Sequence, residues 1–219
     1  MISYPRSIYV VRHCEREDNI NRQWRKIKGY EQFDRDNSPL SSRGKQQALE
    51  LQKHFANIHI DHCFASPFDR TMETAHTICS SKGLAVKPEP GLCEVLYLCV
   101  SPPSFWNADK LKDSYSTADV DYLPAFTKHT LPREGMGDDA CCDRVSRMLD
   151  YVTTKYSGDL LLVSHGAAIG AINQRLNGEF TYVGQATITK YTESAQGKFK
   201  QDFANNPNHL TDKSNLRPW

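Results

Sequence analysis

The sequence predicts an α/β fold with a mostly parallel central sheet flanked by helices on both faces. Short apolar runs bounded by turn residues alternate along the chain with segments in which apolar residues recur at helical spacing. The run Leu160 to Val163 is apolar at every position, which is typical of a strand buried on both faces of a parallel sheet. This alternation favours a sheet covered by helices over a β-sandwich or a helical bundle.

Five strands and four helices are expected. The strands span Ser7 to Val11, His62 to Ala65, Ala85 to Lys87, Leu160 to Val163 and Ala186 to Tyr191. The helical patterns run through Ala48, Leu51 and Phe55, through Met72 to Cys79 with Gly83 closing the helix, from about Asp138 to Tyr156, and from Ala167 to Leu176. Ser66 is expected to cap the second helix, with Pro67 at its first position.

Two long insertions, about residues 17–40 and 95–135, interrupt the alternation inside what we interpret as a single domain over residues 1–219. Loops of this length in compact domains tend to build binding sites. We expect both to form the wall of the substrate site, with aromatic side chains that either contact a flat or bulky leaving group or serve as ordinary core. These side chains are Trp24, Tyr30, Phe33, Trp106 and Tyr115.

The charge balance of the chain argues against nucleic acid or a membrane as a partner. The 27 Lys and Arg residues balance 26 Asp and Glu residues, so no global field attracts nucleic acid or an anionic membrane, and no apolar run is long enough to span a bilayer. Seven cysteines occur with no Cys-x-x-Cys pair. We therefore expect reduced thiols and a cytoplasmic protein.

The end of the first predicted strand carries the first candidate site residues. Arg12, His13 and Arg16 follow it, at the edge of an open α/β sheet where ligands usually bind. One guanidinium group can bind two phosphate oxygens at once, and an imidazole with a free nitrogen can attack phosphorus. The pattern indicates phosphoryl transfer, although by itself it also fits a solvated charged turn.

Two further segments place similar chemistry at the ends of other strands. Arg70 falls in the first turns of the second predicted helix, where its charge opposes the helix dipole unless an anion neutralises both. His165 directly follows the strand that ends at Val163. Either a turn cap or a ligand to a phosphate oxygen would explain this histidine, and the other motifs favour the phosphate.

Glu94 is the leading candidate for a proton donor, because a carboxyl group near a phosphate is pushed toward its protonated form. Glu15 and Glu134 are competitors. His13, His165 and Glu94 could also form a metal site with two histidines and one carboxylate. Three neighbouring arginines would repel a divalent cation, so we expect neither a metal nor another cofactor.

Together, the motifs Arg12-His13-x-x-Arg16, Ser66-Pro67-x-x-Arg70-Thr71, Glu94 and Ser164-His165-Gly166 resemble the histidine phosphatase superfamily, also called the phosphoglycerate-mutase-like fold. The segment from Asp36 to Ala48 is similar to the one that leads into that family's first helix. Within the superfamily, the segments 89–94 and 115–123 resemble the TULA phosphatase domains and ecdysteroid-phosphate phosphatase.

The resemblance implies that His13 is the nucleophile that becomes phosphohistidine. Arg12, Arg16, Arg70 and His165 would form the phosphate pocket, and Glu94 would donate the proton. The substrate would be a phosphorylated small molecule or a phosphoprotein, and a homodimer is a family-level implication. Cys14 stands where the family most often has glycine, and we expect its side chain to narrow the approach to His13. Val95 replaces an aromatic residue of the TULA branch.

The leading hypothesis is therefore a metal-independent phosphatase that hydrolyses a phosphomonoester through phosphohistidine. One alternative is a phosphotransferase of the phosphoglycerate mutase type, which returns the phosphoryl group to a product. The other is a non-catalytic module that only binds phosphorylated partners. Fold alone does not separate these three functions.

Overall fold

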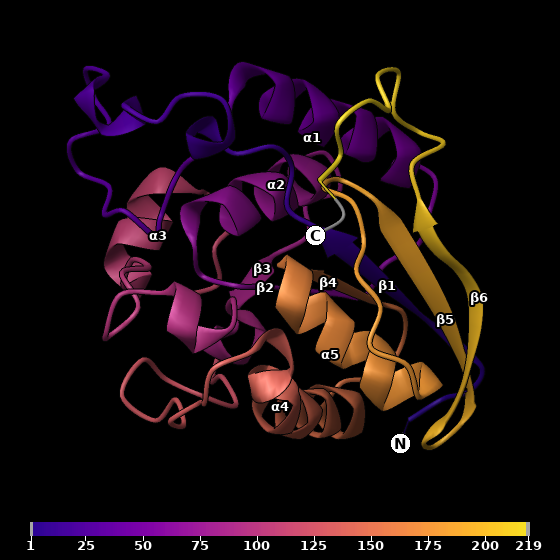
Figure 1. Ribbon diagram of the computed structural model, residues 1–219. Helices are drawn as coiled ribbons and strands as arrows, with labels where there is room; N and C mark the ends of the chain where they lie inside the picture. The colour runs from indigo at the N-terminus through magenta and orange to yellow at the C-terminus, as the bar shows by residue number, and fades with distance from the viewer. Residues whose placement is uncertain (1, 218–219) are drawn as a thin grey trace.

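The computed structural model describes residues 2–217, within which six strands form one sheet in the order β3-β2-β4-β1-β5-β6 (Figure 1). β1 (Arg6–Arg12), β2 (His62–Ala65), β3 (Val86–Pro88) and β4 (Leu160–Ser164) run parallel. β5 (Ile188–Ala195) is antiparallel to β1, and β6 (Lys198–Asn206) is antiparallel to β5. The predicted mostly parallel α/β sheet is confirmed.

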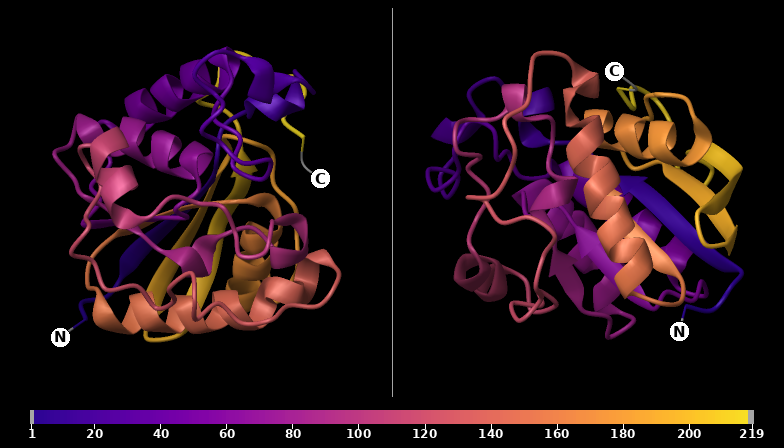
Figure 2. Two further views of the ribbon diagram at one scale, coloured as in Figure 1. Left: turned by 90° about the vertical axis from the view of Figure 1, so that its left-hand side faces the viewer. Right: turned by 90° about the horizontal axis from the view of Figure 1, so that it is seen from below.

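Helices cover both faces of the sheet, and Figure 2 shows the resulting layers. α1 (Ser42–Phe55) and α2 (Asp69–Ser80) lie on one face, and α4 (Cys142–Lys155) and α5 (Gly166–Asn177) on the other. The 95–135 insertion holds the short α3 (Ala108–Ser114). Five 3-10 turns complete the described elements: η1 (Glu17–Asn19), η2 (Trp24–Lys26), η3 (Pro90–Leu92), η4 (Leu96–Leu98) and η5 (Asp138–Cys141).

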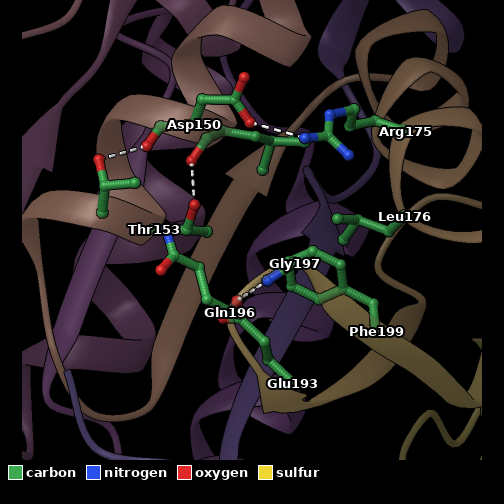
Figure 3. A pocket seen from close by; sticks show the side chains of 10 residues that line it. Asp150, Thr153, Arg175, Leu176, Glu193, Gln196, Gly197 and Phe199 are labelled. Carbon is green, nitrogen blue, oxygen red and sulfur yellow. Dashed lines mark hydrogen bonds and ion pairs between the residues drawn. The ribbon is translucent and has the colours of Figure 1, made fainter.

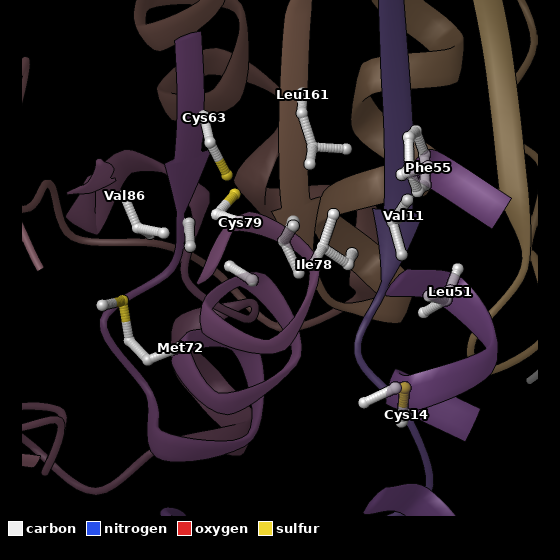
Figure 4. Packing of buried hydrophobic residues seen from close by; sticks show 14 of the residues in the cluster. Val11, Cys14, Leu51, Phe55, Cys63, Met72, Ile78, Cys79, Val86 and Leu161 are labelled. Atoms are coloured by element: carbon white, nitrogen blue, oxygen red, sulfur yellow. The ribbon is translucent and has the colours of Figure 1, made fainter. Parts of the chain in front are cut away.

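The sheet is buried on both faces because successive side chains of each central strand point to opposite sides. In β1, Tyr9 and Val11 belong to the cluster under α1 and α2, whereas Ile8 and Val10 belong to the cluster under α4 and α5. Figure 4 shows the first cluster, with Val11 beside Phe55 of α1. This double burial explains why the central strands read as continuous apolar runs.

The end of α2 confirms the predicted glycine cap. The helix ends at Ser80, Gly83 has a φ of 61°, and the backbone N–H groups of Gly83 and Leu84 donate to the carbonyls of Ser80 and Cys79. The start of α2 differs from the prediction: α2 begins at Asp69 with Phe68 as its cap residue, so the prediction that Ser66 caps it is wrong. The Ser66 hydroxyl instead contacts His165. β6 was not predicted, because its sequence is largely polar.

No helix within residues 2–217 is long and apolar enough to cross a membrane. All seven cysteines lie in this range and carry free thiols.

Candidate active site

The pairing of β1 with β4 brings the two predicted histidines together. Arg12 stands opposite Ser164 in the parallel register, and the backbone N–H of His13 donates to the Ser164 carbonyl at 2.9 Å. The chain turns out of the sheet directly after both strands. As a result, the rings of His13 and His165 lie with their centroids 5.3 Å apart.

A backbone contact fixes the tautomer of His13. Its Nδ1 lies 2.7 Å from the carbonyl oxygen of Cys14. A carbonyl only accepts hydrogen bonds, so Nδ1 carries the proton and Nε2 keeps its lone pair. This leaves Nε2 as the nitrogen able to attack an electrophile.

The surroundings of His13 favour its neutral form. The side chain is buried, and burial, followed by the charges of Arg70, Arg12 and Arg16, lowers its pKa well below 6.5. His165 has a lowered pKa from burial and from the same arginines. The charges of Arg70, Arg12 and Arg16 therefore act on both imidazoles.

Arg12 is held by main-chain oxygens far away in the sequence. Its Nη1 donates to the carbonyls of Val183 at 2.7 Å and Arg217 at 2.5 Å. Gly166, the first residue of α5, lies against the guanidinium; a β-carbon there would come within 3.3 Å of Arg12 Cζ. Burial lowers the pKa of Arg12 to about 10, so the group is still a cation at neutral pH.

Arg70 and Arg16, whose charges act on both histidines, line a pocket of about 210 Å³, whereas Arg12, His13 and His165 do not line it. Arg70 is buried, its Nη1 donates to the Asp36 carbonyl at 2.8 Å, and its guanidinium lies 4.7 Å from the centre of the Phe68 ring. Arg16 pairs with Asp18 at 3.0 Å. The pocket is lined by Arg16, Asp18, Arg35, Asp36, Arg70, Glu94, Leu98 and Cys99.

Several buried polar atoms of this site are unpaired. Within residues 2–217, Arg12 Nε, Arg70 Nε and His165 Nδ1 have no hydrogen-bond partner, while Ser66 Oγ occupies His165 Nε2 at 2.7 Å. Buried donors are rarely left unsatisfied in a folded protein without a functional reason. Two guanidinium donors beside two neutral imidazoles fit a tetrahedral anion.

Glu94 lies at the same pocket. Its Oε1 accepts from the backbone N–H of Val95 at 3.0 Å and of Ala167, in the first turn of α5, at 3.3 Å. Its charge acts on both Arg12 and Arg70. The segment before it is held by Arg144, whose guanidinium donates to the carbonyls of Gly91, Cys93 and Glu94.

The two competing carboxylates are used elsewhere. Glu15 is buried, accepting from the Ser41 hydroxyl at 2.8 Å and pairing with Arg43 at 2.9 Å. Glu134 pairs with Arg144 at 2.6 Å and accepts from the Leu96 backbone N–H at 2.7 Å. Neither lines the arginine pocket. Of the three candidates, the structure brings only Glu94 to the histidines and arginines.

The expectation about Cys14 is wrong. Its side chain is fully buried in the cluster on the α1 side of the sheet, where Figure 4 shows it near Leu51. It contributes to the core and does not project toward the arginine pocket. Val95 is also fully buried, in the cluster under α4 and α5.

Of the two roles expected for the aromatic side chains of the insertions, the structure shows packing against other side chains. Phe33 stacks on Trp106 at 5.0 Å, Trp24 packs on Phe33 and Tyr30, and the Tyr115 hydroxyl donates to Asp69 at 2.5 Å. None of these five rings lines the arginine pocket. Large aromatic rings gain free energy when they bury one another. The stacking of Phe33 on Trp106 also joins the two insertions. Both insertions reach the pocket through other residues, among them Arg35 and Leu98.

A second pocket, of about 220 Å³, lies near the opposite edge of the sheet, between α4, α5 and the β5–β6 hairpin (Figure 3). Its charged groups already have partners: Asp150 pairs with Arg175 at 2.8 Å, and Glu193 pairs with Arg6 at 2.7 Å. These charged groups are therefore less available to a ligand than those of the arginine pocket. Within residues 2–217, no group of three His, Cys, Asp or Glu side chains is arranged to hold a metal ion.

The sequence reasoning missed the residues that support the site. Asp36, Ser66 and Arg144 hold Arg70, His165 and the Glu94 segment by hydrogen bonds between residues 34 to 99 positions apart in the chain. Ser66 and Asp36 belong to quoted motifs, so a signal existed for them. Nothing local marks Arg144, which reads as part of an amphipathic helix.

Comparison with known proteins supports the family that the sequence motifs resemble. The family model described as histidine phosphatase superfamily (branch 1) matches residues 8–194. The chain is 28% identical over 166 residues to the probable phosphoglycerate mutase GpmB of Escherichia coli, covering 75% of this chain and 72% of that protein. It is 29% identical over 174 residues to the putative phosphoserine phosphatase 2 of Hydrogenobacter thermophilus, covering 78% of each.

Solved structures share the fold. The ecdysone phosphate phosphatase from Bombix mori, in complex with tungstate, matches with a TM-score of 0.68 at 18% identity, over 95% of this chain and 96% of that one. A phosphoserine phosphatase mutant from Entamoeba histolytica matches with a TM-score of 0.60 at 20% identity, over 93% and 98%.

Proposed function

Because the chain belongs to the histidine phosphatase superfamily (branch 1), we propose that it hydrolyses a phosphomonoester through a covalent phosphohistidine on His13, without a metal. The observation that carries this proposal is the contact between His13 Nδ1 and the Cys14 carbonyl, which directs the lone pair to Nε2. No hydrogen bond within residues 2–217 occupies Nε2, and the charges of three arginines act on this imidazole. A module that only binds phosphate has no need of a neutral, oriented nucleophile.

In the first step, His13 Nε2 attacks phosphorus and the bond from phosphorus to the ester oxygen breaks. Glu94, in its protonated form, gives its proton to the departing oxygen. Arg12, Arg16 and Arg70 stabilise the charge on the transferring group, and His165 contacts a phosphate oxygen. The electron pair of the broken bond leaves with the alcohol.

In the second step, water attacks phosphorus and the bond from phosphorus to Nε2 breaks. The Glu94 carboxylate takes a proton from that water, which restores the acid for the next turnover. Inorganic phosphate leaves, and His13 returns to its neutral form. A mutase would instead transfer the phosphoryl group to a second hydroxyl.

The direct test compares wild type with His13→Ala on p-nitrophenyl phosphate, with His59→Ala as the matched control because His59 is exposed and lies outside the pocket. We expect His13→Ala to lose at least about 10³-fold in kcat, because covalent catalysis is removed. With ³²P-labelled substrate, an acid-labile but base-stable label should remain on the wild-type protein and not on this variant. Equal activity in the two proteins would rule out the mechanism.

The relative named as a probable phosphoglycerate mutase supports the transferase as the second candidate. Incubation with 3-phosphoglycerate separates the two activities, because a phosphatase releases inorganic phosphate whereas a mutase forms the isomer. Isomerisation faster than phosphate release would replace the proposed reaction with transfer.

A further inference from the structure

A further pocket, of about 210 Å³, lies between the 95–135 insertion and the ends of β2 and β3. It shares no lining residue with the arginine pocket. Ten of its thirteen lining residues are apolar or aromatic, and four of these are the prolines Pro67, Pro88, Pro90 and Pro124. Because a proline ring fixes its own φ angle, this wall is stiff and the pocket is preformed. We call it the proline pocket.

Aromatic rings that are held from outside form another wall of the proline pocket. Trp106 stacks on Phe33 with ring centroids 5.0 Å apart, and Phe105 packs edge-on against Phe68 at 5.5 Å. Rings fixed in this way offer flat apolar surface at low entropic cost. Since an apolar cavity of about 150 Å³ holds benzene, a volume of about 210 Å³ has room for a two-ring aromatic group.

Three polar side chains also line the proline pocket, and one of them has unused hydrogen-bond donors. Asn107 caps α3, and Asp119 pairs with Lys87 at 3.8 Å. Lys128 donates to the Phe105 carbonyl at 2.6 Å, and its ammonium lies 4.5 Å from the centre of the Phe105 ring. An ammonium group carries three donors, so Lys128 can bind a further acceptor beside that ring.

We propose that the proline pocket binds a small aromatic carboxylate, with the ring of the ligand against Phe105 and Trp106 and its carboxylate on Lys128. The apolar walls account for the ring, and charge complementarity with the ammonium accounts for the carboxylate. The charges of Asp34 and Asp36 act on Lys128, but within residues 2–217 neither carboxylate forms an ion pair with it. The ammonium is therefore available to a ligand.

The ring of Phe68 connects the proline pocket to the active site without merging the two. It contacts Phe105 of the pocket, and its centre lies 4.7 Å from the Arg70 guanidinium and 5.4 Å from the centre of the His165 ring. Neither Arg70 nor His165 lines the proline pocket. We therefore expect the carboxylate ligand and phosphate to bind at the same time, and the inference does not depend on the proposed phosphatase function.

The test compares indole-3-acetate with its neutral amide, indole-3-acetamide, in NMR titrations of the full chain. We expect wild type to bind the acid with a Kd of about 1 mM or tighter. The amide should bind about tenfold more weakly, because a hydrogen bond between two charged groups is lost. In Lys128→Gln the two affinities should lie within about twofold of each other.

Two matched variants locate the bound ring. Val120→Trp should abolish binding of both compounds, because Val120 lines the proline pocket and is 38% exposed, so that the larger ring fills the pocket without entering the core. Leu123→Trp should bind as wild type does, since Leu123 is 72% exposed and lies outside the lining. Ala108→Trp, at a second exposed lining position, replaces Val120→Trp if thermal melting shows that variant to be unfolded.

Four results would overturn the inference. The first is no binding of the acid to wild type, and the second is equal affinity of wild type for the acid and the amide. The third is loss of binding under saturating inorganic phosphate, which would place the acid in the arginine pocket. The fourth is binding that Lys128→Gln weakens and that a folded Val120→Trp or Ala108→Trp variant leaves unchanged. This last result would assign the acid to a neighbouring pocket of about 440 Å³ that Lys128 also lines.

Discussion

In the proposed mechanism, a single hydrogen bond decides which nitrogen of His13 attacks phosphorus. Because Nδ1 of His13 donates to the carbonyl of its own neighbour Cys14, the backbone that ends β1 orients the imidazole. The same turn positions the Arg12 guanidinium to donate hydrogen bonds to the carbonyls of Val183 and Arg217. In the proposed mechanism, the end of β1 thus supplies both the nucleophile and one of the groups that stabilise charge.

The lowered pKa of His13 predicts the acid side of the pH profile. In the proposed mechanism the neutral imidazole is the reactive form, and burial and the arginines lower its pKa well below 6.5. Activity is lost as pH falls through that pKa, so the acid limb of kcat/KM, corrected for substrate ionisation, should lie below pH 6.5. A profile of p-nitrophenyl phosphate hydrolysis from pH 4 to 8 measures it. A His13-dependent midpoint at or above 6.5 would contradict the prediction.

The role of Glu94 predicts a dependence on the leaving group. In Glu94→Gln, kcat for an alkyl phosphate should fall by about 10²-fold to 10⁴-fold, because the alcohol departs without a proton. The loss should be much smaller with p-nitrophenyl phosphate, whose leaving group needs no protonation. Glu15→Gln is the control, since Glu15 is bound to Ser41 and Arg43. Equal losses on the two esters would remove Glu94 from the proton-donor role.

At the scale of elements, Asp36 connects the two insertions to the phosphate pocket. Its carboxylate accepts from the backbone N–H of Val100 at 2.9 Å and of Ser104 at 3.3 Å, and from the Ser104 hydroxyl. Its carbonyl accepts from Arg70. Asp36 is therefore a positioning residue for Arg70.

Asp36→Ala should weaken inhibition by inorganic phosphate by about tenfold, since hydrogen bonds to charged groups are worth about 1.5–3 kcal/mol each. Ser104→Ala, which removes one of the three donors, should have a smaller effect. Asp34→Ala is the control, because Asp34 is exposed in the same loop. The inhibition constant for phosphate and the thermal midpoint are measured on each variant. A lower midpoint with unchanged phosphate inhibition would show that Asp36 only stabilises the fold.

At the scale of the molecule, the end of the chain returns to the first strand. Leu210 is buried in the cluster under α1 and α2, the Leu216 carbonyl accepts from Gln185, and the Arg217 carbonyl accepts from Arg12. Figure 1 shows this segment above the carboxyl end of β1. Residues from the two ends of the sequence therefore complete one anion site.

Removal of residues 211–219 should weaken phosphate inhibition by about tenfold, because Arg12 loses one of its two carbonyl partners. The fold should persist, since Leu210 stays in the core. Asp212→Ala, which removes an exposed pair with Arg43 and two hydrogen bonds from Ser214 but leaves the Arg217 carbonyl in place, should match wild type. Unchanged phosphate inhibition in the truncated chain would show that the segment does not position Arg12.

Much of the fold was predictable, because local sequence encodes it. The predicted strand over residues 62–65 has the bounds found in the structure, and those at the first and fourth strands differ by only a residue or so. β6 could not be recognised in the same way, since its sequence is largely polar and its pairing with β5 is a tertiary contact. The start of α2 was misplaced because Ser66 is committed to His165.

The sequence by itself determined which residues stand at the strand ends, and hence that arginine and histidine would meet at one edge of the sheet, because parallel strands align their carboxyl ends there. It left open which of three glutamates belongs to the site and where Cys14 and the aromatic rings point. Only the tertiary structure decided these points. Burial and ion pairing with distant partners such as Arg43 and Arg144 are properties of packing, and no local pattern records them.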